Sequence, residues 1–492
     1  MAADKPNLTP DSKIVIVGAG VFGLSTALHL TKRGYKNIHL FDRQPFDKNN
    51  YDEQLGAHGA SCDLNKIIRA SYGGEKLYQD LAFKAMPVWS AWNDELAGTA
   101  KDELPDALDP EIKLWHNCGF LRLSRDGLEG KERETQEGFP GAIKGTQYRV
   151  SDGQRVKDAL REGIPKTKID PFRRGERGLP VDGVLDMTAG YALASRACAW
   201  VLHLLKKTGV VRTYFGEENG LKSLIKDGRK VTGITTTSGS SHSADLLIIA
   251  CGGWTPSLLP STEHLLETTS GSVLAIQLPP KSERPDLWAK YSAENFPVWS
   301  WNMGSYTPHS DDHIGGLYGL PVTPEGVVKV AFRGAKWTNY SRRTSDAREA
   351  LSYPRTDLDK VPQEAMRVLR TFCKENLPDL LSLPLSTIRL CWYTDSVDNS
   401  FLISYVPDAE NVVVASGGSG HGFKFLPVLG EHVVDVIEGK KTAYTDLFSW
   451  RDVPRGKKNG LEEGPEGWRV LGKQRLVGGR EWKGGLGAGS RL

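Results

Sequence analysis

The chain has 492 residues, of which 39% are hydrophobic and 25% are charged, and this composition excludes a largely disordered protein. The length predicts two or more closely packed domains. The formal net charge of +3 comes from 63 basic and 60 acidic residues and argues against a nucleic-acid-binding surface. The 53 glycines gather in a few loops without a G-X-Y period, so collagen is excluded and close approach of the backbone to another group is expected.

Membrane spans, metal sites and disulfides are not expected either. No apolar run approaches the roughly 18 residues of a membrane span, and the N-terminus lacks the apolar segment of a signal peptide. The six cysteines have no C-x-x-C spacing and indicate a reduced, intracellular chain with one or two special thiols, although their number permits disulfides. They are Cys62, Cys118, Cys198, Cys251, Cys373 and Cys391. We expect no metal, no membrane partner and a monomer.

Residues 13–42 are typical of a βαβ unit that binds a dinucleotide. An apolar run over 13–17 predicts a buried strand, and Gly18-Ala-Gly20-Val-Phe-Gly23 leads into a helical pattern that ends at Gly34. A second strand then runs into Asp42, which can bond ribose hydroxyls. The glycines allow a tight turn, approach to a pyrophosphate at the helix N-terminus and helix–strand packing. A glycine-containing turn in an ordinary α/β core is the alternative.

Later segments extend this nucleotide fold. Residues 221–237 resemble a hairpin around Asp227-Gly228, and 245–251 predict a buried strand that ends in Gly252-Gly253-Trp254. A hairpin between the halves of a nucleotide fold suits an FAD enzyme better than a simple NAD dehydrogenase. A strand over 411–415 runs into the glycine-rich residues 416–424 and an amphipathic helix, so this last loop is expected to return to the cofactor.

Four motifs in this order carry a resemblance to a known family. They are Gly18–Gly23, Asp63-Leu-Asn-Lys66-Ile-Ile-Arg69-Ala-Ser-Tyr-Gly73, Cys391-Trp-Tyr-Thr394 and Gly420-His-Gly-Phe-Lys424. Over about residues 13–440 the chain resembles the monomeric sarcosine oxidase family of flavoproteins. Within this family it is similar to the fungal branch of fructosyl amino acid oxidases (amadoriases), saccharopine oxidases and pipecolate oxidases.

The resemblance implies an α/β fold in which a Rossmann-like FAD-binding domain is interleaved with an α+β substrate domain built on a mainly antiparallel sheet. We expect the FAD-binding domain at 1–85, 186–269 and 386–445, and the substrate domain at 86–185 and 270–385. Residues 446–492 are expected to form a basic, glycine-rich tail, as a surface wrap or a flexible end; from 451 onward they hold ten basic and five acidic residues.

The resemblance also implies that Cys391 bears FAD through an 8α-S-cysteinyl bond. A thiolate is a suitable nucleophile for the electrophilic flavin methyl group. By position alone, a buried and inert cysteine is the commoner outcome. The other residues expected to contact FAD are Gly18, Gly20, Val21, Phe22, Gly23, Asp42, Arg43, Asn65, Lys66, Gly252, Gly420, Gly422, Phe423 and Lys424.

Two cations match the family residues that hold the substrate carboxylate. Lys424 follows the last glycine-rich loop, and the planar guanidinium of Arg69 suits bidentate recognition. Lys66 stands where the family has an arginine near the flavin, and Cys62 where it has a histidine, so the polar contacts there are in doubt. His421 could serve the site or only pack the loop. A structural salt bridge is the alternative for Arg69 and Lys66.

Lys329 matches the family lysine that activates dioxygen. It alternates with Val328 and Val330 on a predicted strand, so its side chain points to the opposite face from theirs. If that face meets the flavin, the ammonium can stabilise developing superoxide. The alternative is an edge-strand lysine that faces water.

The activity implied by the resemblance is oxidation of a secondary-amine amino acid. Hydride would pass to flavin N5 to give an imine, and O₂ would reoxidise the flavin and give hydrogen peroxide. Saccharopine-, fructosyl amino acid-, pipecolate- and N-methyl amino acid-type substrates all stay open. The alternatives are an FAD-dependent amine dehydrogenase, an oxidative cyclase of secondary metabolism, or a non-catalytic nucleotide-binding scaffold. Ser490-Arg491-Leu492 resembles a peroxisomal address, which predicts a peroxisomal import receptor as a partner, with the cytoplasm as the alternative location.

Overall fold

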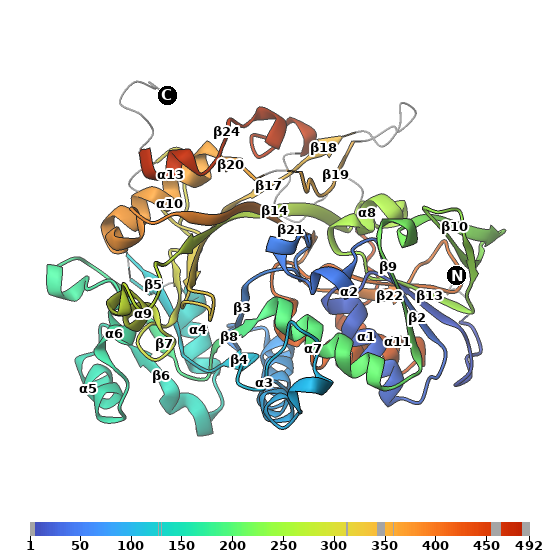
Figure 1. The fold of residues 1–492 in the computed structure, drawn as a ribbon, viewed down its shortest axis with the longest axis horizontal. Helices are drawn as coiled ribbons and strands as arrows, with labels where there is room; N and C mark the ends of the chain where they lie inside the picture. Colours follow the sequence, from blue (N-terminus) through green and yellow to red (C-terminus); the bar gives the residue numbers. More distant parts are fainter. Residues whose placement is uncertain are drawn as a thin grey trace.

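The computed structural model describes residues 5–125, 127–128, 130–310, 313–341, 350–357, 359–453 and 464–484. Figure 1 shows two large sheets side by side, one on the right of the view and one across the upper left. Together they reproduce the expected combination of a Rossmann-like sheet and a mainly antiparallel sheet.

The first sheet has six strands in the order β22-β23-β13-β1-β2-β9. Their bounds are β1 (Ile14–Val17), β2 (Ile38–Asp42), β9 (Val211–Phe215), β13 (Leu246–Ile249), β22 (Leu402–Tyr405) and β23 (Val412–Ser416). All neighbours are parallel except β22 and β23. One face is covered by α1 (Val21–Lys32), α7 (Ala194–Lys207) and α11 (Leu429–Ile437). The predicted βαβ unit is confirmed, because the wholly apolar β1 lies buried between β2 and β13.

The other face of this sheet carries the predicted hairpin. It consists of β10 (Leu221–Asp227) and β11 (Lys230–Thr236), with the short β12 (Ser241–Ser243) alongside. Apolar residues of the hairpin, such as Ile234, pack against Val15 and Leu247 of the sheet.

The second sheet has eight strands in the order β21-β14-β17-β16-β15-β5-β7-β6. Their bounds are β5 (Phe120–Ser124), β6 (Gln147–Arg149), β7 (Asp182–Asp186), β14 (Leu266–Gln277), β15 (Val298–Trp301), β16 (Leu317–Leu320), β17 (Val327–Trp337) and β21 (Leu385–Ser396). Only β15 and β5 pair in parallel. The amphipathic α10 (Gln363–Asn376) covers one face through residues such as Phe372, which leaves the opposite face for the site.

A small sheet connects the two halves. It has the order β3-β8-β4, with β3 (Asn65–Ile68), β4 (Trp115–His116) and β8 (Gly190–Leu193). The long α3 (Lys76–Ala97) buries Trp89 and Trp92 in the core that contains α1. α3 runs continuously through residue 85, where the boundary between the two domains is expected, and the domain limits themselves stay a prediction.

Part of the C-terminal segment packs more tightly than its sequence indicates. β24 (Leu476–Val477) pairs with β20 (Val361–Pro362), and α13 (Arg480–Gly484) lies against α10 with Trp482 fully buried. The apolar residues of this segment have no helical or strand period, so their positions depend on packing against α10 and on the pairing of β24 with β20. The expected terminal address at 490–492 lies outside the described residues.

The remaining short elements are α2 (Phe46–Asn49), α4 (Gly130–Gly138), α5 (Gly153–Arg161), α6 (Lys166–Ile169), α8 (Thr255–Leu258), α9 (Pro285–Tyr291), α12 (Ala443–Leu447), β18 (Tyr340–Ser341) and β19 (Leu351–Ser352). All six cysteines are free thiols. Within the described ranges, no helix is long and apolar enough to cross a membrane. No group of three or more His, Cys, Asp or Glu side chains in the same ranges could hold a metal ion.

Candidate cofactor and substrate site

The loop between β1 and α1 requires glycine at two positions. Gly18 has a φ of 104°, which disfavours a side chain, and a Cβ on it would overlap the carbonyl oxygen of Ala250. A Cβ on Gly23, in the first turn of α1, would overlap the carbonyl oxygen of Gly18. The tight turn and the close packing of α1 against β1 therefore both depend on glycines that the sequence motif predicts.

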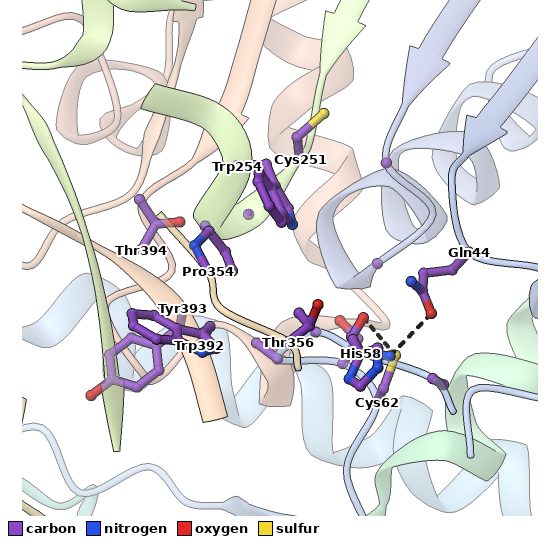
Figure 2. Close-up of a pocket in the computed structure, with 18 of the residues that line it drawn as sticks. Gln44, His58, Cys62, Cys251, Trp254, Pro354, Thr356, Trp392, Tyr393 and Thr394 are labelled. Carbon is purple, nitrogen blue, oxygen red and sulfur yellow. Dashed lines mark hydrogen bonds between the residues drawn. The ribbon is translucent and has the colours of Figure 1, made fainter. Parts of the chain in front are cut away.

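A cavity of about 860 Å³ opens beside this loop and extends to the eight-stranded sheet. Its volume suits a large ligand. Figure 2 shows Gln44, His58 and Cys62 toward one side, with Trp392 and Tyr393 on the opposite side. Among the residues predicted to contact FAD, the lining includes Gly18, Gly20, Val21, Phe22, Asp42, Arg43, Lys66, Gly252, Gly420, Gly422 and Phe423. The lining does not include Gly23, Asn65, Cys391 or Lys424.

Asp42 ends β2 at the wall of this cavity. Its two carboxylate oxygens accept hydrogen bonds from the backbone N–H groups of Ala19 (2.7 Å) and Gln44 (2.8 Å). Burial nevertheless raises the pKa of Asp42 to about 6, because no cation lies close enough to offset it fully. The neighbouring Arg43 lies over the ring of Trp254, with its Cζ 4.9 Å from the ring centroid. An acid and a cation thus stand at the nucleotide end of the cavity.

A second group of charges, which we call the Asp63 cluster, joins the two halves of the molecule. It consists of Asp63, Lys66, Lys329, Arg389 and Glu53. The Asp63 carboxylate lies 2.6 Å from Lys66 Nζ, 2.7 Å from Lys329 Nζ and 3.1 Å from Arg389 Nη2. Burial acts to raise the pKa of Asp63, but the three cations outweigh it and hold that pKa well below its usual range. Asp63 is therefore an anion in the folded protein.

Lys329 is one of these cations and is only 1% exposed. β17 lies between β14 and β16, so the alternative of a water-facing lysine on an edge strand is wrong. Its Nζ also donates to the backbone oxygen of Asn65 at 2.8 Å. Burial lowers the pKa of Lys329 from its ordinary value, although Asp63 acts in the opposite direction.

Cys391 lies on β21, on the same face of the sheet as Lys329. It pairs with Gly271 across β14 and packs with Val273 and Ala331. Lys66 Nζ donates to its Sγ at 3.7 Å. The fold thus brings the predicted flavin-bearing thiol to a lysine that lines the cavity, while the covalent bond itself stays a prediction.

A third group, which we call the Tyr72 cluster, lies beside the last glycine-rich loop. Lys424 Nζ donates to the Tyr72 hydroxyl at 3.0 Å and to the backbone oxygen of His421 at 2.8 Å. The Tyr72 hydroxyl is then free to donate to His421 Nδ1 at 3.0 Å, while Nε2 donates to the backbone oxygen of Asn399 at 2.9 Å. Burial, followed by the charge of Lys424, lowers the pKa of His421 well below its usual value, so this ring is neutral.

Arg69 completes the Tyr72 cluster. Its Cζ lies 4.6 Å from the centroid of the Tyr72 ring, and its guanidinium donates to the backbone oxygen of Ser71. Burial, and then the charges of Arg69 and Arg333, lower the pKa of Lys424 well below its usual value. In the described parts of the chain, neither Arg69 nor Lys424 forms an ion pair with an acid. The two predicted carboxylate-binding residues therefore meet around one tyrosine without a counter-ion.

The sequence matches the model of the family described as FAD dependent oxidoreductase (DAO) over residues 13–436. The chain belongs to this family. It is 28% identical over 456 residues to L-saccharopine oxidase of Schizosaccharomyces pombe, covering 89% of this chain and 93% of that one. It is 27% identical over 453 residues to peroxisomal sarcosine oxidase of Homo sapiens, covering 89% and 94%. The solved fructosyl peptide oxidase from E. terrenum has the same fold, with a TM-score of 0.74, 21% identity and coverage of 95% and 98%.

The residues of this flavin-dependent oxidoreductase fit FAD. The glycine-lined turn leaves room for a pyrophosphate at the N-terminus of α1, and the Asp42 carboxylate, which lines the same cavity, is of the kind that would bind a ribose. Toward the eight-stranded sheet, Asn65 is fully buried, yet both polar atoms of its side chain lack a partner among the described residues. Such an amide is costly to leave unbonded and requires a polar partner, although Asn65 does not itself line the cavity.

Several residues of the oxidoreductase's site escaped the sequence-based prediction. Asp63 and Tyr72 both lie within a motif that was used for the resemblance, but nothing in their spacing shows which cations they contact. Arg333 is four residues after Lys329 on one strand, so alternation alone would have placed both on one face. Arg389 and Tyr393 lie two residues before and two residues after Cys391 on β21, so alternation would likewise have placed them on the face of Cys391.

Proposed function

We propose that this flavin-dependent oxidoreductase is an oxidase of an amino acid that carries a secondary amine. The observation that carries the proposal is the Tyr72 cluster, in which Arg69 and Lys424 are cations without an acidic partner, next to the loop that lines the cofactor cavity. A carboxylate is the ligand that such a pair binds best. Relatives named for saccharopine, sarcosine and N-methyl-L-tryptophan oxidation support a secondary amine beside that carboxylate.

FAD would supply the acceptor for the hydride of the C–H bond beside the nitrogen, and loss of the N–H proton would leave an imine. The two electrons would then pass to O₂, which takes up two protons and becomes hydrogen peroxide. Arg69 and Lys424 hold the carboxylate and thereby orient the amine-bearing carbon toward the cavity. Tyr72 fixes both cations, and the neutral His421 locks the tyrosine hydroxyl. An amine that enters unprotonated needs no general base, so none is assigned.

Lys329 is proposed to present its ammonium to dioxygen. Its position on the inner face of the sheet, beside Lys66 and Cys391, supports this role. Cys391 is proposed to tether FAD covalently. A yellow pellet after acid precipitation of the purified protein would support the tether, and a colourless pellet with a flavin-coloured supernatant would contradict it.

Peroxisomal import, with a monomeric enzyme, is part of the same proposal. Relatives from Homo sapiens and Mus musculus that are named peroxisomal sarcosine oxidase support the location. Co-localisation of a fluorescent fusion with a peroxisomal marker tests it, and a diffuse signal would favour the cytoplasm.

A peroxide-coupled assay tests the activity. The purified enzyme is given saccharopine, pipecolate, N-methyl-L-tryptophan, sarcosine and a fructosyl amino acid, each beside the matching amine that lacks the carboxylate. We expect peroxide from at least one acid and none from its decarboxylated partner. Turnover of the acid with an artificial electron acceptor but without peroxide would identify a dehydrogenase instead. No turnover of any acid with either acceptor would refute the proposal.

A further inference from the structure

A third unpaired cation, Arg333, reaches the site from β17. It is four residues after Lys329, on the same face of the sheet. Its guanidinium lies against the last glycine-rich loop so closely that a Cβ on Gly420 would overlap it. Gly420 itself lines the cofactor cavity, so the guanidinium lies against a loop that forms part of the cavity wall.

Two contacts hold the guanidinium in one orientation. Nε donates to the hydroxyl of Tyr393 at 3.2 Å, and Nη2 donates to the backbone oxygen of Ser419 at 2.9 Å. Cζ lies 5.3 Å from the centroid of the Tyr393 ring. No described residue accepts a hydrogen bond from Nη1. The Arg333 guanidinium is thus held through Nε and Nη2, while Nη1 remains available to a ligand.

No described acid forms an ion pair with Arg333. Burial, the Tyr393 hydroxyl and then the charge of Asp395 act on the pKa of Arg333. The Asp395 carboxylate already accepts hydrogen bonds from Lys336 Nζ at 3.0 Å and from Thr269 Oγ1 at 2.5 Å, so it has a cation of its own. Arg333 is close enough to Lys424 to contribute to lowering its pKa. Arg69, Lys424 and Arg333 therefore form one positive site with no acid paired to it among the described residues, and a cation buried as deeply as Lys424 is costly without an anion.

We propose that Arg333 binds a second acidic group of the substrate, so that the preferred substrate is an N-alkyl amino acid with two carboxylates. The inference rests on the proposed function. One carboxylate satisfies Arg69 and Lys424 around Tyr72, while Arg333 is supported separately by Tyr393 and β17 and offers its free edge to another carboxylate. The second group lies on the side of the amine that faces the eight-stranded sheet.

Matched substrates test this. N-(2-carboxyethyl)glycine has two carboxylates, N-(2-carbamoylethyl)glycine replaces the distal one by a neutral amide of the same shape, and sarcosine has only the first. We expect kcat/KM for the diacid to exceed that for the amide by about 100-fold. In Arg333→Met this ratio should fall to within about threefold of one, mainly through a higher KM for the diacid.

Controls keep this outcome interpretable. Arg333→Lys should keep part of the preference because the charge remains, and Arg284→Met removes an exposed arginine that pairs with Asp286 and should change nothing. The flavin content of each variant shows whether it has folded. An equal loss of both substrates in Arg333→Met would mean that Arg333 serves the first carboxylate or the cofactor, and would overturn the inference.

A binding measurement separates this inference from the proposed function. The thioether 3-(carboxymethylthio)propionate replaces the amine by sulfur and has no C–N bond to oxidise. We expect calorimetry to show binding that weakens by about 100-fold in Arg333→Met, and an equally weak affinity for its distal carboxamide. If the thioether binds in this way but no amine is oxidised, the activity is wrong and the second acidic subsite stands. If amines are oxidised but the distal carboxylate has no effect, the subsite is wrong and the activity stands.

Discussion

The Asp63 cluster and the cluster around Tyr72 differ in how their charges are balanced. In the first, Lys66, Lys329 and Arg389 surround Asp63, and Arg389 also lies 2.6 Å from Glu53. In the second, Lys424 and Arg69 are held by a tyrosine, a histidine carbonyl and a serine carbonyl, all of them neutral. Each cation of the first cluster thus has an acidic partner within the chain, whereas Arg69 and Lys424 in the second have none among the described residues.

This difference separates a framework from a binding site. Cations that have counter-ions within the chain stabilise the fold and hold Lys329 in place. Cations that have only neutral partners keep their affinity for a ligand, at a cost to the stability of the ligand-free protein. Four substitutions, together with the Arg333 experiment, test this difference between the Asp63 cluster and the Tyr72 cluster.

The largest effect is expected from Asp63→Asn. It leaves three buried cations with one acid fewer, and loss of one partner from a buried ion network costs about 3–5 kcal/mol. Equilibrium urea unfolding of the flavin-loaded protein measures the change. Asp286→Asn, at an exposed pair with Arg284, should lose far less stability because solvent screens this pair. Equal losses in the two variants would show that the Asp63 cluster is not the framework described here.

Lys424→Met should affect binding without a loss of stability. Loss of a charged contact to the carboxylate should reduce kcat/KM by about 100-fold to 1,000-fold, mainly through KM. The unfolding free energy should stay the same or rise by about 1 kcal/mol, because a buried cation without an acid is removed. Lys84→Met, at a lysine that lies over Tyr444, is the control for both measurements. A fall in kcat at constant KM would contradict the binding role.

Of the two half-reactions, Lys329→Met should slow the oxygen reaction, and it should also cost stability because it removes a buried partner of Asp63. We expect the second-order rate constant with O₂ to fall by about 100-fold, since one positioned charge is lost. Anaerobic reduction by substrate should change by less than about threefold, and stopped-flow spectroscopy separates the two steps. Lys336→Met removes another ion-paired lysine from the same strand, at a partly buried position, and serves as the control. Equal slowing of the O₂ step in both variants would count against a specific role for Lys329.

The smallest effect concerns Asp42, an acid whose oxygens are held by backbone amides alone. Its pKa is raised by burial from 3.8 to about 6, so the folded protein keeps a proton that the unfolded chain loses. Stability from this group is present below pH 4 and is lost as the pH rises through about 6, by up to about 2 kcal/mol in the cofactor-free protein. Asp42→Asn should remove that slope between pH 4 and pH 6 in urea unfolding. An identical slope in both proteins would show that Asp42 is already ionised at acidic pH.

Local patterns predicted a large part of the fold. The wholly apolar run of β1, the spacing of Gly18, Gly20 and Gly23, and the turn at Asp227-Gly228 each encode their structure within a few neighbours. The structure confirms these elements. Trp482 shows the limit of such patterns, because it lies in a glycine-rich segment without periodicity and is buried only through α10.

Some residues of the site could likewise be predicted from local sequence, and others could not. Gly18, Asp42 and Gly420 could be predicted because their roles depend on backbone geometry within one turn, and all three line the cavity. The contacts of Asp63 could not, because Lys329 is 266 residues away in the chain and reaches it only through sheet register.

By itself, the sequence determined a dinucleotide fold, a family of flavin-dependent oxidoreductases and the identity of the cations Arg69, Lys329 and Lys424. Residue type and local spacing carry the dinucleotide fold, since glycine geometry and periodicity need no distant partner, whereas the family and the three cations were predicted from the resemblance of the sequence motifs to that family. Only the tertiary structure decided which cation has a counter-ion. Lys329 meets Asp63, while Arg69, Lys424 and Arg333 meet no acid among the described residues. Long-range packing sets the Coulomb energy of each charge, and with it the distinction between a support of the fold and a site for an anion.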